Sequence, residues 1–320
     1  MNTPHPLADL VPAGARVLWV ASSGGHFAQL MRIADSVDVD PKSAWVTFAN
    51  PQTVGALEGR NSHFVDYIAP RDVKGAARAA RWAAGHLRTE RYDVCISTGA
   101  ALAVSVLPIA AARGLETTYV ESISRVDGPS LSGRMLQYFP RIRTYTQHQG
   151  WESRRWAWKG SILDSWKPQP REQDTSPRRF FVTLGTIRPY RFDRAIDAVL
   201  SVLAPGDEVT WQLGSSYRDG LPGTVHREVE PQEFRRLALE SDATVTHAGV
   251  GSILELLDLG VTPAVVVRAR SNAEHVDDHQ RQIAHAMTTR GLAFELDLDR
   301  PSRDALLSSA GHGAVSTAAA

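Results

Sequence analysis

The 320-residue sequence has only one cysteine, Cys95, and no long uninterrupted apolar stretch. A single cysteine excludes an internal disulfide framework and a cysteine-based zinc site, and it suits a reducing compartment. The longest apolar stretch, residues 100–112, is too short to span a bilayer. Residues 1–10 carry prolines and an aspartate where a signal peptide needs an apolar core. We therefore expect a cytoplasmic protein that meets a membrane, if at all, peripherally at its inner face.

The sequence also has no excess of either charge. It contains 35 basic and 35 acidic residues, so the balance gives no indication of nucleic acid binding. No Asp-x-Asp pair follows an expected strand, where it would hold a divalent metal; Asp38 and Asp40 have this spacing but precede Pro41 in an expected loop. We expect neither a metal ion nor an organic cofactor.

Short apolar runs alternate with helical patterns along most of the chain. This β-α-β alternation predicts parallel sheets covered by helices. Residues 163–179 interrupt it with a polar, proline-containing stretch that is typical of a linker, and the Ala/Ser/Gly-rich end, 308–320, is expected to fray. We predict Rossmann-like domains over residues 1–165 and 179–320, joined by a linker over 166–178. Their ligands would bind beyond the carboxyl ends of the strands.

The segment His247–Glu255 (HAGVGSILE) directly follows an expected strand. Its glycines would let a phosphate approach the backbone, and Ser252 and the first amides of the next helix could donate to it. Glu255, one turn inside that helix, suits the two hydroxyls of a ribose. The alternative is a tight strand-to-helix turn with a capping serine.

Two further segments are expected at the same edge of the second sheet. Residues 181–186 (FVTLGT) form a strand that ends in Gly-Thr, and residues 272–280 (NAEHVDDHQ) place polar groups before a helix. Arg268, Arg270 and His275 nearby would suit a carboxylate on the donor sugar.

The stretch HAGVGSILELLDLGVTPAVVV, followed by DHQ, resembles the donor half of glycosyltransferase family 28. The likeness extends to the two-subunit N-acetylglucosaminyltransferase of dolichol-linked oligosaccharide assembly and to bacterial exopolysaccharide transferases. It implies an α/β fold of the GT-B type, with two Rossmann-like domains facing across a cleft. It assigns the ribose to Glu255 and the sugar hydroxyls to Gln280, although the family often has Asn where this chain has Asp278. The implied UDP-sugar pocket consists of Gly185, Thr186, Gln212, Gly214, His247, Gly249, Gly251, Ser252, Glu255, His279 and Gln280.

The N-terminal half has its own glycine-rich turn, Ser22-Ser23-Gly24-Gly25-His26, between an expected strand and helix. Its glycines would admit an anionic ligand, and His26 at the helix start is a candidate general base. The alternative is that His26 merely caps the helix.

Three motifs of this half, SSGGHFAQL, STGAALAV and YVESISRVDGPSLSGRML, resemble the partner subunit of the same two-subunit transferase. The two subunits would thus be fused here, with the acceptor half first. The acceptor-side candidates are Gly24, Gly25, Glu121, Ser122 and Arg125. For the last three, the alternative is an ordinary polar loop.

Residues 134–159 combine arginines and a lysine with tyrosine, phenylalanine and three tryptophans. Such a mixture suits an anionic lipid surface; the alternative is a solvated face whose tryptophans pack inward.

Together these features predict a metal-independent, inverting glycosyltransferase. It would move a sugar from a UDP-sugar to a hydroxyl, on a polyprenyl-pyrophosphate-linked acceptor in exopolysaccharide or cell-envelope glycan assembly. One alternative is a sugar-nucleotide epimerase that uses Glu121, Glu274 and Asp277. The other is a non-catalytic accessory subunit that binds UDP-sugar.

Overall fold

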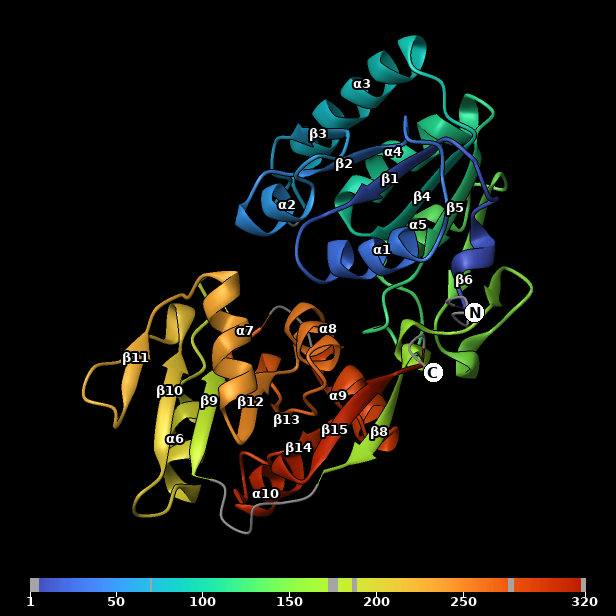
Figure 1. Ribbon diagram of the computed structural model, residues 1–320. Helices are drawn as coiled ribbons and strands as arrows, with labels where there is room; N and C mark the ends of the chain where they lie inside the picture. Colours follow the sequence, from blue (N-terminus) through green and yellow to red (C-terminus); the bar gives the residue numbers. More distant parts are fainter. Residues whose placement is uncertain (1–5, 70, 172–177, 186–188, 276–278, 318–320) are drawn as a thin grey trace. The chain divides into compact units, whose positions relative to one another are not determined.

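The computed structural model of the chain describes residues 6–69, 71–171, 178–185, 189–275 and 279–317. The polypeptide divides into two compact units, Met1–Asp164 and Ser165–Ala320, each with its own sheet and core (Figure 1).

The first unit is built on a sheet whose described strands follow the order β3-β2-β1-β4-β5-β6-β7. All neighbouring pairs are parallel, as the β-α-β alternation predicts. The strands are β1 (Val17–Ala21), β2 (Ala44–Phe48), β3 (Ser62–Val65), β4 (Val94–Gly99), β5 (Glu116–Val120), β6 (Ile142–Thr146) and β7 (Trp156–Trp158). The helices are α1 (Gly25–Asp35), α2 (Pro51–Ala56), α3 (Val73–Thr89), α4 (Ala101–Ala112) and α5 (Leu131–Leu136).

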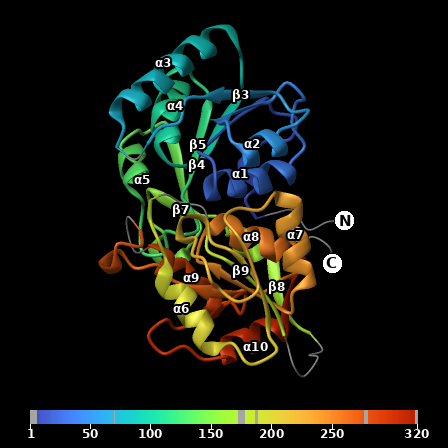
Figure 2. The same ribbon diagram turned by 90° about the vertical axis from the view of Figure 1, so that its left-hand side faces the viewer.

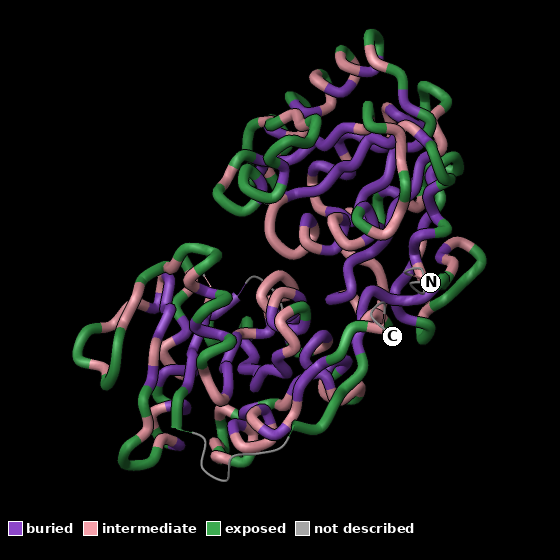
Figure 3. The backbone as a smooth tube through the Cα atoms, viewed as in Figure 1, coloured by how far each residue is buried: buried purple, intermediate pink, exposed green. Residues whose placement is uncertain are grey.

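Helices cover both faces of this sheet (Figures 1 and 2). Leu18 of β1 packs in one core with α3 and α4. Trp19, which points to the other face, stacks on Trp45 with ring centroids 5.6 Å apart, and Trp45 also contacts Phe27 of α1. The central strands are therefore buried on both sides, as Figure 3 shows, which explains why they are uninterrupted apolar runs in the sequence.

The second unit repeats this plan. Its described parallel strands follow the order β11-β10-β9-β12-β13-β14. They are β9 (Arg179–Thr183), β10 (Glu208–Gln212), β11 (Thr224–His226), β12 (Ala243–His247), β13 (Ala264–Val266) and β14 (Phe294–Glu295). The helices are α6 (Asp193–Val202), α7 (Pro231–Glu240), α8 (Val250–Asp258), α9 (His279–Thr289) and α10 (Asp304–Ala310). Phe180 packs against α6 and α10, whereas Phe181 packs against α7 and α8, so helices again cover both faces.

Both sheets have the strand order of doubly wound nucleotide-binding folds, in which the order reverses beside the first strand. The reversal lies between β1 and β4 in the first unit and between β9 and β12 in the second. Loops that leave the carboxyl ends of these strands run to opposite faces and leave a crevice for a ligand. The glycine-rich segments of the sequence lie at these two positions.

Two expectations about irregular segments are wrong. The first part of the expected linker, Trp166–Pro170, forms β8, and the end that was expected to fray contains β15 (His312–Ser316), which pairs with β8 antiparallel. Pro168 and Pro170 suggested a linker, but they lie in β8, which pairs with only β15 among the described strands, so a missing N–H is tolerated. Residues 172–177 and 318–320 lie outside the described residues.

Candidate functional site

The segment His247–Glu255 lies at the strand-order reversal of the second sheet. β12 ends at His247, Gly249 is the N-cap, and α8 begins at Val250. Gly251 and Ser252 are therefore the second and third residues of the helix, and the interpretation of Ser252 as a cap is wrong. The first amides of a helix lack intrahelical acceptors and favour an anion.

The imidazole of His247 packs closely against Gly185 and Gly249. A β-carbon on Gly185 would lie 2.5 Å from Cε1 of His247, and one on Gly249 would lie 2.2 Å from its Nε2. Gly185 also has a φ of +72°, a conformation that favours glycine. Both glycines thus leave the space that the histidine ring occupies, a role that the motif alone does not indicate.

Burial, together with the nearby Arg268 charge, lowers the pKa of His247 to about 3. The ring is therefore neutral at physiological pH. Its Nδ1 is buried and has no partner among the described residues. Such an orphan polar atom is unusual in a folded protein and is a position that a ligand could satisfy.

The expected pocket residues on β10 contribute to the same edge. The Gln212 side chain is buried, and its Nε2 donates to Oγ1 of Thr183 at 3.2 Å. Gly214 has a φ of +53°, and its amide donates to the Arg227 carbonyl at 2.8 Å. Thr186 lies outside the described residues.

Glu255 and the start of α9 complete the expected donor residues. Nε of Arg235 lies 3.3 Å from Oε1 of Glu255, and both side chains are partly exposed. An exposed pair of this kind is weak, so a ribose could displace it. The rings of His279 and His275 meet edge to face at 4.9 Å. Gln280 is buried, and its Oε1 accepts the Arg268 amide at 3.3 Å; Asp278 lies outside the described residues.

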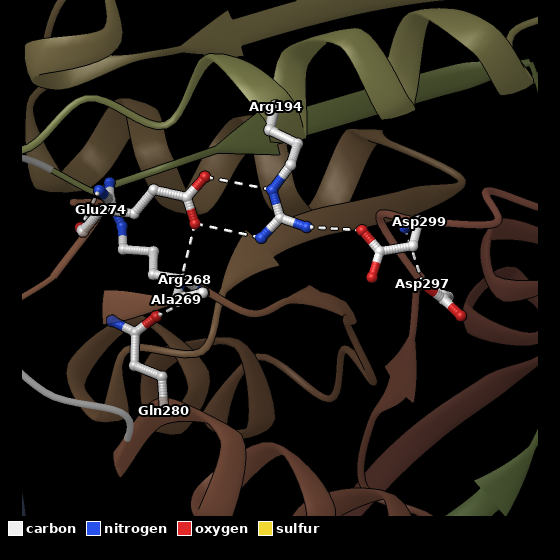
Figure 4. A network of polar contacts seen from close by, with 7 residues as sticks. All are labelled: Arg194, Arg268, Ala269, Glu274, Gln280, Asp297 and Asp299. Carbon is white, nitrogen blue, oxygen red and sulfur yellow. Dashed lines mark hydrogen bonds and ion pairs between the residues drawn. The ribbon is translucent and has the colours of Figure 1, made fainter. Parts of the chain in front are cut away.

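A buried charged cluster beside these residues was not predicted (Figure 4). The Glu274 carboxylate accepts two bonds from Arg194, at 3.2 and 3.1 Å, and one from the Ala269 amide at 2.8 Å. Arg268 donates to the carbonyls of Leu184 and Glu274 at 2.8 and 3.1 Å. The arginine directly after an apolar strand was the available signal, but it was interpreted as a contact to a sugar carboxylate. Because the guanidinium is directed to main-chain carbonyls, that interpretation of Arg268 is wrong.

His26 lies at the strand-order reversal of the first sheet, as the second residue of α1. Its Nδ1 lies 2.7 Å from the Thr98 carbonyl oxygen. A carbonyl only accepts, so Nδ1 carries the proton and Nε2 of a neutral ring keeps its lone pair. A β-carbon on Gly99, whose φ is +129°, would lie 2.6 Å from Cε1 of His26. The interpretation of His26 as a helix cap is wrong, because Gly24 is the N-cap and the ring bonds to Thr98.

The turn before His26 places the Gly24 amide and the Ser22 hydroxyl near the start of α1. Gly24 has a φ of +80°, and its amide donates to Oε1 of Gln52 at 2.8 Å; Gly25 is the first helical residue. The Ser22 hydroxyl is buried without a partner among the described residues. Its place in the glycine-rich motif could have marked it as a candidate.

Glu121, an expected acceptor residue, is fully buried. Its two oxygens accept bonds from the Tyr119 hydroxyl, the Ser122 amide, and both the amide and hydroxyl of Ser130, all within 3.0 Å. Burial raises the pKa of this carboxyl, but four donors satisfy it. Glu121 therefore holds the loop after β5 in place, and a direct contact with an acceptor would require breaking these bonds.

Ser122 and Arg125 lie in the same loop. The Ser122 hydroxyl accepts from Nε2 of Gln29 at 3.1 Å and is buried. The Arg125 carbonyl accepts from Nε1 of Trp151 at 3.1 Å. These bonds fix the loop, while a role in acceptor binding stays a prediction.

Comparison with known protein families gives a match within the second unit. Residues 181–295 match the glycosyltransferase family 28 C-terminal domain. The matched residues all lie in the second unit. They include every expected donor residue from Gly185 to Gln280, whereas His26 and the acceptor-side candidates lie outside the match.

Solved structures place the whole chain among GT-B folds. MurG of Acinetobacter baumannii is similar with a TM-score of 0.57 and 16% identity, over 91% of this chain and 88% of that chain. CalG4, the calicheamicin glycosyltransferase, gives 0.56 and 16%, over 93% and 90%. UDP-GlcNAc 2-epimerase from Methanocaldococcus jannaschii gives 0.51 and 10%, over 86% and 92%. No curated protein sequence matches. The chain therefore has the GT-B fold, and its second unit contains a domain similar to the C-terminal domain of glycosyltransferase family 28.

Across the described residues, no three His, Cys, Asp or Glu side chains are grouped so that they could hold a metal ion. None of the described helices combines the length and apolarity needed to cross a bilayer.

Proposed function

We propose that the protein transfers a sugar from a UDP-sugar to an acceptor hydroxyl with inversion at the anomeric carbon. The observation that carries this proposal is the family 28 domain, which contains all the expected donor residues. The open first turn of α8, the Gly185 turn and Glu255 offer groups suited to a diphosphate and a ribose.

The chemistry follows from His26. Its Nε2 lone pair takes the proton of the acceptor hydroxyl while that oxygen attacks the anomeric carbon. The bond from this carbon to the diphosphate oxygen breaks, and UDP leaves with the electron pair. Amides at the start of α8 stabilise the charge that develops on UDP. A single displacement inverts the anomeric centre.

For the acceptor we propose a polyprenyl-pyrophosphate-linked sugar in exopolysaccharide or cell-envelope glycan assembly. The start of α1, with Gly24, Gly25 and the unpartnered Ser22 hydroxyl, supports an anion on the acceptor side. The resemblance of the first half to the acceptor-side subunit points to the same class.

A lipid-linked acceptor requires contact with a membrane, for which we propose the exposed surface of α5 and the turn after it. Leu131 and Tyr138 are 69% and 80% exposed, and Met135 and Phe139 are also exposed. Arg134, Arg141 and Arg154 lie exposed in the same stretch. By contrast, Trp156 is buried and Trp151 packs against it at 5.1 Å, so the apolar contacts would come from α5 rather than from these tryptophans.

Sedimentation with vesicles tests this surface. Met135→Glu combined with Tyr138→Glu should reduce binding to vesicles that contain anionic lipid at least fivefold. Leu239→Glu, at an equally exposed apolar residue of α7, is the control and should bind like the wild type. Equal binding by the double variant would remove the α5 surface from the proposal.

An epimerase is the second candidate, because an epimerase shares the fold. Of the three carboxylates that such a reaction would need, Glu121 is held by four donors and Glu274 by Arg194, and Asp277 lies outside the described residues. Incubation with UDP-N-acetylglucosamine alone discriminates the two, since an epimerase converts it without an acceptor and a transferase does not.

A thermal-shift screen of UDP-sugars tests the donor class. A ligand that binds only the folded state at 100 times its Kd adds about 2.7 kcal/mol to stability, so the cognate donor should raise Tm by several degrees. GDP- and ADP-sugars are the controls. Transfer should survive EDTA if the reaction is metal-independent. An accessory subunit would bind UDP-sugar, yet His26→Ala and Glu255→Ala would leave transfer in cell extracts intact.

A further inference from the structure

Arg268 is a charged side chain in the core of the second unit, with 1% of its surface exposed. It follows β13, at the carboxyl edge of the sheet. Burying an ion is costly unless polar groups replace water around it. A group placed there against this cost needs a structural or functional reason.

The guanidinium is held mainly by main-chain carbonyls. Its Nη2 donates to Leu184 at 2.8 Å, and its Nη1 donates to Glu274 at 3.1 Å and to Tyr190 at 3.4 Å. The Phe192 ring lies 4.7 Å from its central carbon. Arg268 therefore links Leu184, which precedes Gly185, to Tyr190 and to the loop after β13, which contains Glu274.

The carboxylate of Glu274 is directed elsewhere. It binds Arg194 through both oxygens and accepts the Ala269 amide (Figure 4). From Glu274, the Arg268 guanidinium bonds only the main-chain carbonyl, to which Nη1 donates, and its Nε is buried without a partner among the described residues. The nearby Glu274 charge favours the charged form of Arg268, whose pKa burial lowers. The groups that bond the guanidinium are nevertheless carbonyl dipoles, so its positive charge is not paired directly with a carboxylate.

Those surroundings are the expected donor residues. Leu184 directly precedes Gly185, which seats the His247 ring. The Arg268 amide binds Oε1 of Gln280. The Arg268 charge also reaches His247, since it contributes to the lowered pKa of that ring.

We propose that Arg268 is a positioning residue for the diphosphate of the donor: it fixes the start of the Gly185 turn and places a buried positive charge beneath the diphosphate. This inference rests on the proposed function, because it takes a nucleoside diphosphate as the ligand. Since Arg268 is buried, it acts through the turn and through its field rather than by touching the ligand.

Calorimetric titration of the full chain with uridine, UMP and UDP tests the inference. Arg268→Met should weaken UDP binding at least tenfold, weaken UMP binding less, and leave uridine within twofold of the wild type. Arg268→Lys, which keeps the charge but loses the planar fork, should recover part of the UDP affinity. Arg281→Met, at an exposed arginine of α9, is the control and should bind all three ligands normally.

A purely structural role would weaken uridine and UDP by the same factor, and that result would overturn the inference, as would unchanged UDP affinity. If circular dichroism shows that Arg268→Met is unfolded, Arg268→Lys decides: the inference expects at least a threefold loss for UDP and none for uridine, and equal losses contradict it. Absence of UDP binding by the wild type would overturn the proposed function as well, which distinguishes the two failures.

Discussion

His26 and His247 are built into the two units in a similar way. Each lies where the strand order of its sheet reverses, and each ring lies against a glycine at the carboxyl end of the neighbouring strand: Gly99 ends β4, and Gly185 follows β9. Their chemistry differs. The bond to the Thr98 carbonyl places the proton of a neutral His26 ring on Nδ1, so Nε2 is the nitrogen that can accept a proton. By contrast, burial keeps His247 neutral and suits it to a fixed polar contact.

Gly99→Ala should displace the His26 ring. The new β-carbon would lie 2.6 Å from Cε1, and the φ of +129° disfavours alanine. Sugar transfer should fall about a hundredfold, within the range expected for losing a general base, while calorimetric UDP affinity stays within twofold. Gly85→Ala in α3, where a β-carbon meets nothing within 4 Å, is the control. A fully active Gly99→Ala variant would show that transfer does not depend on the packing of the His26 ring against Gly99.

His247 makes stability depend on pH. Its pKa falls from an ordinary value of 6.5 to about 3 on folding. Between these pH values the imidazole is therefore protonated in the unfolded chain and neutral in the native state. This contribution is complete above pH 6.5 and is lost as pH falls from 6.5 toward 3, by up to about 1.4 kcal/mol per pH unit. Urea unfolding at pH 7 and pH 5 should show a larger loss for the wild type than for His247→Gln. Parallel losses in the two proteins would contradict this prediction.

Short motifs predicted the position in the fold of some candidate residues correctly and that of others wrongly. Gly-Gly-His between a strand and a helix marked His26 at the correct edge, because strand ends and helix starts are local features. Glu121 was predicted to contact the acceptor, and only the fold shows that four donors already surround its carboxylate. Arg268 was misinterpreted for the same reason, since its carbonyl partners come from residues up to 84 positions away.

Among the structural elements, the buried parallel strands were the most predictable. The apolar runs at 44–48 and 243–246 correspond to β2 and β12 almost residue for residue, because burial on both faces leaves a continuous apolar signal. Short elements such as α5, β7 and β14 carry too few residues for a periodic pattern. The pairing of β8 with β15 joins residues more than 140 positions apart, which local composition cannot indicate.

The contact of β15 with Gly260 should contribute to the stability of the second unit. Ala314 is buried, and its amide donates to the Gly260 carbonyl at 3.1 Å. Ala314→Pro removes this donor and leaves the Gly260 carbonyl without it, which should lower the free energy of unfolding by about 1–3 kcal/mol. Val315→Thr, at the exposed neighbouring position, should change it by no more than about 0.5 kcal/mol. If urea unfolding gives the same stability for both variants, the contact of β15 with Gly260 contributes little to the second unit.

At the scale of the whole molecule, the strand orders of both sheets explain why the sequence was recognisable as a doubly wound α/β chain. The fold alone does not decide the reaction, since GT-B transferases and a sugar-nucleotide epimerase share it. The match of residues 181–295 to the family 28 C-terminal domain favours a transferase, and activation of an acceptor by residues of the first unit stays a prediction.

The most direct test of the account is transfer of labelled sugar from UDP-sugars to lipid-linked acceptors in a membrane extract. The wild type should move label into the lipid fraction and release UDP in equal amount. His26→Gln should reduce this transfer by about 10²- to 10⁴-fold while still binding UDP, and His285→Gln, at an exposed histidine, should match the wild type. Transfer by His26→Gln at the wild-type rate, or no transfer from any UDP-sugar that binds, would contradict the account.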